Sequence, residues 1–422
     1  SSLFLRGRRC ISRSMASETW LLKVKQVVAR RRFHSGSLSS IPLHNHVPKS
    51  STTFPTRRLG VLAFEVSGLM SKLFHLWQSL SDKNISHLRH VSISLTGVRK
   101  IVSNDDSFIL GIACAEMVEA LRRISLTISR LAQRCAVAKY RNFHGRFMEL
   151  VESGRDPEKW IISWNKMEAS NKLMDKYVSL TCALYKEMVE LKAARMQFND
   201  GKAELVDAHE RVGLLKRKSL WSKSYDMVVS MLVKSVFTVM ARIKLVFQVG
   251  HAGFWAANFR LLHPPDTTLG AAGLAFHYAN VILALEKMIR APQLVGLQER
   301  DDLYSMLPAS LQLSLKCRLR SVRFASSEPE LAGEWKMAVG RLLGWLSPLA
   351  KNMMKWQSAR SFERRGNLAA CGVGGENVMV WQTLVFANRE KAEAAITELL
   401  VGLNYIWRYE REMAAMASEE EE

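Results

Sequence analysis

The residues best placed to do chemistry lie in the stretch TLGAAGLAFHYANVILALEK, which covers residues 268–287. Its two glycines, Gly270 and Gly273, are followed by three polar residues, His277, Tyr278 and Asn280. Such a stretch could form a phosphate-binding turn, a catalytic pocket or a closely packed helix. The glycine spacing is neither GxGxxG nor GxxxxGK[ST], and no strand-like run precedes it. The pattern therefore excludes the common nucleotide-binding loops.

A buried helix is the interpretation that the same stretch favours. Residues 266–268 are cap-forming and predict a helix that begins near Leu269. The glycines and alanines would give another helix a smooth surface to approach, so Ala272→Leu is expected to be strongly destabilising. The polar residues would then form a hydrogen-bonded core network. The alternative is a ligand pocket at these residues, in which case His277→Ala would remove a function without unfolding the protein.

Other candidate sites lack the partners that their chemistry needs. His87 and His90 are three residues apart, but no cysteine pair or second histidine pair accompanies them, so a zinc site is not predicted. CGVGGEN (371–377) is not preceded by a strand, and Glu65 has no catalytic partner nearby. GxSxG, HExxH and protein-kinase motifs do not occur. We therefore expect a protein that is not an enzyme and that has no catalytic, cofactor-binding or metal-binding residues.

The elements around these residues are predicted to be helical throughout. Apolar residues recur at spacings of three and four, as expected for one face of a helix, and alternating strand-like runs are scarce. Asn104, Asp105 and Asp106 are predicted to cap one of the longer helices. Asp156-Pro157 is predicted to begin another, which either pairs with 203–217 as a coiled-coil-like hairpin or packs in the bundle. The fold class is therefore all-α, a multi-helix bundle.

Five segments follow from this pattern. They are a disordered basic arm (1–58), an N-terminal helical domain (59–150), a long-helix connecting region (151–262), a C-terminal helical domain (263–410) and an acidic tail (411–422). The best membrane-span candidate, in the connecting region, is interrupted by Lys234, Arg242 and Lys244, so no transmembrane segment is expected.

Half of the net charge of +21 lies in the arm, which has 12 basic residues and one acidic residue, a formal charge of +11. Residues 1–14 precede the first methionine, Met15, and could be a non-native upstream extension. Because no glycine follows Met15, myristoylation at that start is not expected. The arm is Arg- and Ser-rich and almost free of acids, which is typical both of a disordered tail and of a transit peptide.

A second basic cluster is formed by Lys216, Arg217 and Lys218. It could act in nuclear import or contact an anion, or it could be the solvated end of a helix. The arm itself could make weak electrostatic contact with nucleic acid or with an anionic membrane.

Several motifs resemble a plant-specific family, the phytosulfokine-simulator (PSI) proteins. LGVLAFEVSGLMSKLFHLWQSLSD and LTGVRKIVSNDDSFILGIACAE resemble its N-terminal domain. TLGAAGLAFHYANVILALEKM, RDDLYSMLPASLQLSLKCRLR and EWKMAVGRLLGWLSPLA resemble its second domain. The resemblance covers most of 59–410 and is loosest in 151–262.

The resemblance implies a non-enzymatic interaction or scaffold protein that promotes plant growth in phytosulfokine-related signalling. It implies protein partners and a location in the nucleus or cytoplasm, and it supplies no catalytic residue or cofactor. The alternative is a soluble helical protein of the chloroplast or mitochondrion whose basic presequence is cleaved near residues 56–59.

Overall fold

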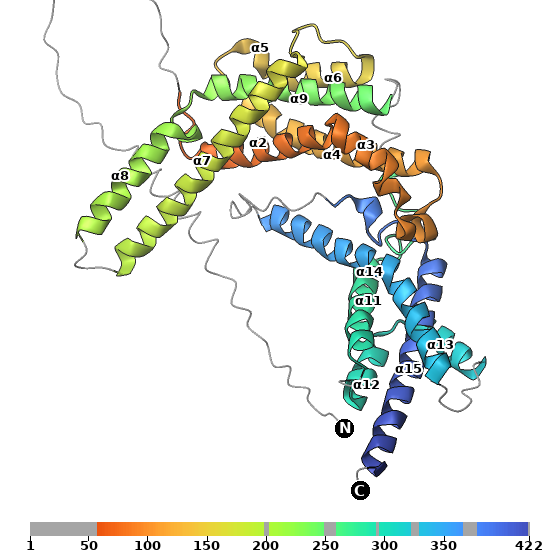
Figure 1. Ribbon diagram of the computed structural model, residues 1–422. Coiled ribbons are helices and arrows are strands. Elements are labelled where there is room, and N and C mark those ends of the chain that lie inside the picture. The colour runs from red at the N-terminus through yellow and green to blue at the C-terminus, as the bar shows by residue number, and fades with distance from the viewer. Residues whose placement is uncertain are drawn as a thin grey trace, which may run out of the picture. The chain divides into compact units, whose positions relative to one another are not determined.

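The computed structural model describes residues 57–197, 202–248, 259–292, 295–321, 329–365 and 378–420. Helices are the main secondary structure of these residues. The β-pairing among them is limited to two isolated bridges, Arg58 with Ser224 and Thr268 with Asn388. The predicted all-α, multi-helix fold is therefore confirmed (Figure 1). Residues 1–56, which hold most of the basic arm, and the CGVGGEN stretch lie outside the described residues.

The first part of the described chain is built around one long apolar helix, α4. The helices here are α2 (Leu62–Ser79), α3 (Asp82–His90), α4 (Asp106–Ala132), α5 (Ala138–Arg141), α6 (Phe143–Ser153) and α9 (Tyr225–Phe247). Between α3 and α4 lie a short 3₁₀-helix, η1 (Ser92–Ser94), and a short π-helix, η2 (Val98–Val102). Asp105 caps α4, since its side chain accepts the N–H of Ser107 at 2.8 Å, as predicted. Helix α4 packs against α2, α6 and α9.

A helical hairpin packs on α2. It consists of α7 (Trp164–Gln197) and α8 (Lys202–Lys218), followed by η3 (Leu220–Ser222). The pairing of these two helices was one of the two predicted arrangements, and α7 also contacts α2 and α9. The predicted helix start at Asp156-Pro157 is wrong, because Lys159 has a φ of 53° and the Asp156 side chain instead accepts the N–H of Ile161 at 2.7 Å.

The C-terminal helices form a second group. They are α11 (Ala275–Arg290), α12 (Leu297–Met306), α13 (Ala309–Ser321), α14 (Pro329–Arg365) and α15 (Arg389–Glu420), with the short turn η6 (Val380–Gln382) before α15. Helix α11 packs along α14 and α15, and α13 packs on α15. Because α9 packs on α4 and α6, part of the predicted connecting region shares the N-terminal core. The boundaries at 150 and 262 remain predictions.

Residues 379–389, which we call the bridging segment, contact both groups of helices. Its backbone N–H groups bind the Glu116 carboxylate of α4 through Val380 (2.8 Å) and the Ile101 carbonyl of η2 through Asn388 (2.6 Å). On the C-terminal side, the carbonyl of Gln382 accepts a hydrogen bond from Asn352 of α14 at 3.2 Å. The segment thereby satisfies its own backbone groups while it joins helices that are distant in sequence.

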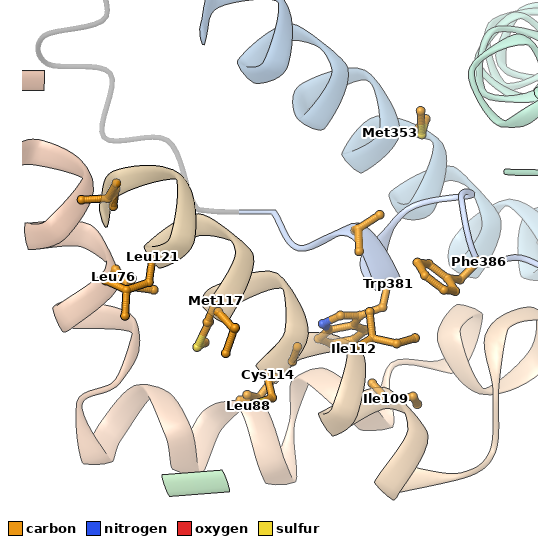
Figure 2. Packing of buried hydrophobic residues seen from close by; sticks show 14 of the residues in the cluster. Leu76, Leu88, Ile109, Ile112, Cys114, Met117, Leu121, Met353, Trp381 and Phe386 are labelled. Carbon is orange, nitrogen blue, oxygen red and sulfur yellow. The ribbon is translucent and has the colours of Figure 1, made fainter. Parts of the chain in front are cut away.

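The apolar side chains of the bridging segment fill the space between α4 and α14. Trp381 is fully buried and lies beside Ile112 of α4, and Met353 of α14 belongs to the same apolar cluster (Figure 2). Phe386 packs edge-on against Phe108 of α4, with ring centroids 6.4 Å apart. Burying large aromatic side chains of this kind is worth several kcal/mol, so the bridging segment contributes strongly to the shared core.

Glu116 is the ionisable group at this junction. It accepts the Val380 N–H and a hydrogen bond from the Trp356 side chain of α14, and the charges of Arg123 on α4 and Arg360 on α14 face it. Burial raises the pKa of the Glu116 carboxyl to about 7, although these hydrogen bonds and charges oppose the rise. The carboxyl is thus held where both of its protonation states are populated near neutral pH.

The raised pKa of Glu116 predicts a pH-dependent stability. Because the folded protein binds this proton more tightly than the unfolded chain, the contribution of Glu116 is present at low pH and is lost as pH rises through about 7. Glu116→Gln keeps an acceptor for Val380 and should reduce the loss of unfolding free energy between about pH 5 and about pH 8 by about 1–3 kcal/mol. Urea unfolding at both pH values measures this difference.

Glu119, one turn further along α4, is the matched control. Partial burial would raise the pKa of its carboxyl, but hydrogen bonds from Arg122 and Arg123 leave the pKa below its usual value. Glu119→Gln should therefore leave the difference between the two pH values unchanged. An equal change in both variants would show that Glu116 is not the group responsible.

Candidate functional site

The glycine-rich stretch forms a turn that pairs with the bridging segment. The N–H groups of Leu269 and Gly270 donate to the carbonyls of Ala387 and Val385, each at 2.9 Å, and the N–H of Arg389 donates to Thr267 at 2.8 Å. The predicted helix start at Leu269 is therefore wrong, because the helix α11 begins at Ala275. The pairing with the bridging segment and the positive φ of Gly273 (69°) hold residues 268–274 in a turn instead.

The two glycines are required for different reasons. A Cβ atom on Gly270 would collide with the carbonyl oxygen of Val385 and would lie 2.7 Å from Val385 Cγ1. Gly273 has open space around it but a φ of 69°, which favours glycine. The close approach predicted at these residues thus occurs at Gly270, with the backbone of the bridging segment rather than a helix as the partner. Ala272 is exposed, so the overpacking predicted there is wrong.

The three polar residues of the motif point to three different partners. His277 Nε2 lies 2.8 Å from the carbonyl oxygen of Met306 at the end of α12. The Tyr278 hydroxyl donates to Glu393 of α15 at 2.7 Å, and Asn280 donates to its own helix at the carbonyl of Phe276, 3.2 Å away. Each side chain therefore has a hydrogen-bond partner, but the three do not converge on a shared cavity or a single network.

Tyr278 leads to a partly buried polar cluster that holds α11, α13 and α15 together. Oε1 of Glu393 accepts hydrogen bonds from Tyr278 (2.7 Å), Arg389 (2.9 Å) and Ser310 (3.0 Å). Burial and then the contact with Glu393 raise the pKa of Tyr278 to about 12. Burial would also raise the pKa of Glu393, but the hydrogen bonds from Arg389, Tyr278 and Ser310 hold it below its usual value.

Glu286, two turns after Tyr278 on α11, forms a similar cluster with α14. Its carboxylate accepts hydrogen bonds from Ser347 (2.6 Å), Lys351 (2.9 Å) and Arg290 (2.5 Å). Although burial would raise the pKa of this carboxyl, these partners leave it below the usual value. The helix α11 is thus fixed by one carboxylate at each neighbour: the half-buried Glu393 on α15, and its own buried Glu286 toward α14.

These clusters are suited to holding helices together rather than to proton transfer. With its pKa at about 12 Tyr278 stays protonated, and Glu393 stays ionised with three donors on one oxygen. Within the described residues, no group of three or more His, Cys, Asp or Glu side chains could hold a metal ion. An open hollow along α8, between Leu205 and Arg217, contains none of the cluster residues.

The remaining residues singled out in the sequence lie on the surface of the N-terminal helices. Glu65 is exposed in the first turn of α2. Lys216, Arg217 and Lys218 form the last turn of α8, where positive charge suits the helix dipole. Lys216 Nζ lies 4.9 Å from the ring centroid of Trp221, and the Arg217 carbonyl accepts the Ser222 hydroxyl at 2.7 Å.

The residues that complete these clusters were not predicted from the sequence. Arg389 and Glu393 are spaced i, i+4 on a helix, a visible pairing signal, and Glu286 is an acidic residue in an apolar run. Neither pattern names the partners Ser310, Ser347 or Lys351, which come from other helices. The role of Trp381 has no local signal, since it depends on packing between distant segments.

The turn predicts a contrast between two neighbouring substitutions. Gly270→Ala should lower the free energy of unfolding by about 1–3 kcal/mol, because the added methyl group must displace the backbone at Val385. Ala272→Leu, at an exposed position, should change it by less than about 0.5 kcal/mol. Urea unfolding of both variants measures the contrast. Greater destabilisation by Ala272→Leu would contradict the described turn.

Two families of unknown function match the chain. The family described as "Domain of unknown function (DUF3475)" matches residues 61–117, which include α2, α3 and the first part of α4. The family described as "Protein of unknown function (DUF668)" matches residues 268–355, from the glycine-rich turn into α14. Most of the bridging segment's contacts described above thus fall within these two matched regions. No solved structure matches the chain.

Three curated proteins of Arabidopsis thaliana are similar over most of this chain. Protein PSK SIMULATOR 1 is 29% identical over 85% of the chain, and PSK SIMULATOR 3 is 28% identical over 82%. PSK SIMULATOR 2 is 26% identical over 85%. The matches cover 57%, 56% and 61% of these relatives, so the chain spans less than two thirds of their length. The chain is a homologue of these three PSK SIMULATOR proteins, and its two matched regions fit that plant family, as its motifs indicated.

Proposed function

We propose that the chain is a non-catalytic helical interaction protein that promotes plant growth in phytosulfokine-related signalling. The names of its relatives support the link to growth, and both matching families are of unknown function. The carboxylates of Glu286 and Glu393 bind several donors each and hold helices together. This use of the polar residues favours a scaffold over a catalyst.

We propose the α7–α8 hairpin as the main surface through which the chain contacts partner proteins. The two helices pack through a small apolar cluster of their own, consisting of Leu184, Leu191, Ala208 and Val212. Other apolar side chains of the hairpin remain outside it: Val189 is 50% exposed, Met196 76% and Val206 57%. Val189 and Met196 are seven residues apart and so lie on one side of α7. Apolar side chains presented in this way are typical of protein contact surfaces.

Substitution of the exposed hairpin residues tests this function. Val189→Ser combined with Val206→Ser should change the melting temperature little, because both side chains are already largely exposed. It should abolish the increase in root growth that the wild-type chain is expected to cause when expressed in Arabidopsis seedlings. Leu184→Ala, in the fully buried cluster, is the control and should lower stability by about 2–5 kcal/mol.

The outcomes separate the two parts of the proposal. Full growth promotion by the Val189/Val206 variant would exclude the hairpin as the contact surface. No growth effect of the wild-type chain would contradict the role in growth itself.

We further propose that the protein acts in the nucleus or cytoplasm. A C-terminal fluorescent fusion that begins at Met15 reports the location in the same seedlings. Chloroplast or mitochondrial fluorescence, with a recovered N-terminus near residues 56–59, would overturn this and support the alternative of a cleaved basic presequence.

The described part of the chain has no helix long and apolar enough to cross a membrane.

A further inference from the structure

Basic residues from three separate parts of the sequence lie near one another around residues 57–60, which precede α2. The backbone of residues 57–60 runs along residues 221–225: Leu59 donates to the carbonyl of Lys223 and Gly60 to that of Trp221, both at 3.0 Å. Tyr225 in turn donates to the carbonyl of Arg57 at 2.7 Å. This pairing places the start of α2, the end of α8 and the start of α9 side by side (Figure 1).

Tyr225 brings the end of α4 to the same place. Its hydroxyl donates to the Leu131 carbonyl at 2.8 Å, and the Arg57 guanidinium lies 5.3 Å from its ring centroid. Burial raises the pKa of Tyr225, and the charges of Arg57 and Arg134 oppose that rise, so both guanidinium groups lie within electrostatic reach of the ring. We call the resulting surface the cationic face; it comprises Arg57, Arg134, Lys216, Arg217, Lys218 and Lys223.

Carboxylates do not neutralise this face. Within the described residues, none of its six cations forms an ion pair. The nearby Asp226 is engaged by the Cys135 thiol (2.6 Å) and the Ala136 N–H (2.9 Å), and Glu65 lies exposed one turn into α2. With six cations against these two acids, the surface is positive.

Exposed aliphatic side chains are interspersed with these cations. Val61 (58% exposed) follows directly after the paired residues 57–60, and Leu214 (43%) is one helical turn before Lys218. Val137 (40%) and Met227 (41%) each adjoin a residue of the Asp226–Ala136 contact. Cations mixed with exposed aliphatic side chains match a membrane interface, where headgroup phosphates bind the charges and the acyl boundary takes up the apolar groups.

We propose that the cationic face binds the surface of an anionic lipid membrane as a peripheral site. Duplex nucleic acid would also be attracted by the charge, but it offers the exposed aliphatic side chains no comparable apolar layer. The proposal goes beyond the function in growth and does not depend on the hairpin as a contact surface.

Vesicle co-sedimentation of the full chain tests the proposal. The wild-type protein should bind phosphatidylcholine vesicles that contain phosphatidylserine and should not bind phosphatidylcholine alone. The combined substitution Lys216→Gln, Arg217→Gln, Lys218→Gln and Lys223→Gln should weaken binding at least about tenfold, since each cation near such a surface is worth about fivefold in affinity. Val61→Ser with Leu214→Ser should weaken vesicle binding but leave binding to duplex DNA unchanged.

The control removes the same number of cations from the C-terminal helices. Lys316→Gln, Arg320→Gln, Arg341→Gln and Lys355→Gln affect exposed side chains of α13 and α14 and should leave vesicle binding unchanged. If the two quadruple variants weakened vesicle binding equally, binding would depend on net charge alone. If the quadruple variant of the cationic face bound vesicles like the wild-type protein, binding would be assigned to the arm. Either result would overturn the proposal. Binding of duplex DNA without binding of anionic vesicles would overturn it as well.

Discussion

The rest of the structure depends on the bridging segment, residues 379–389, and on the need to satisfy its backbone. An irregular segment in a protein interior must find a partner for each N–H and C=O group. Here the partners come from η2, α4, α14 and the turn at 267–270, which are up to 287 residues away in the sequence (Asn388 to Ile101). The buried Trp381 then gains its packing only when those helices are in place. The two regions that match families of unknown function are thereby joined into a shared core.

The carboxylates of Glu286 and Glu393 fix the positions of the helices around this core relative to one another. Apolar burial alone allows helices to slide or rotate at small cost, whereas Glu286 and Glu393 each require donors at fixed positions on a neighbouring helix. Removing either carboxylate would leave a buried donor without its partner, the Tyr278 hydroxyl or the Ser347 hydroxyl, which costs more than the hydrogen bond itself contributes. Glu116 differs from both because burial outweighs its partners and raises its pKa. The same residue type therefore fixes helix positions at two sites and makes a third sensitive to pH.

The predictable part of the structure was the part governed by local pattern. Helical periodicity indicated the all-α fold, and Asp105 was recognisable as a cap because capping needs only adjacent residues. The start of α11 was misplaced because Thr268–Gly270 pair with Val385–Asn388, a contact across more than 100 residues that outweighs local helix propensity. The same reason explains why Tyr278 was singled out without its partner Glu393. The cationic face could not be predicted because only Lys216–Lys218 are adjacent in the sequence. Arg57, Arg134 and Lys223 come near them only through tertiary pairing.

Hydrogen exchange under increasing urea tests the central role of the bridging segment most directly. The amides of Leu269, Gly270, Asn388 and Arg389 donate between distant segments. If the segment joins the two groups of helices, these amides should lose protection in the same opening as the amides in the buried middle of α4 and of α14. Exchange of these four amides in an earlier opening, with α4 and α14 still protected, would contradict the account. The two groups of helices would then be stable without the contacts of the bridging segment.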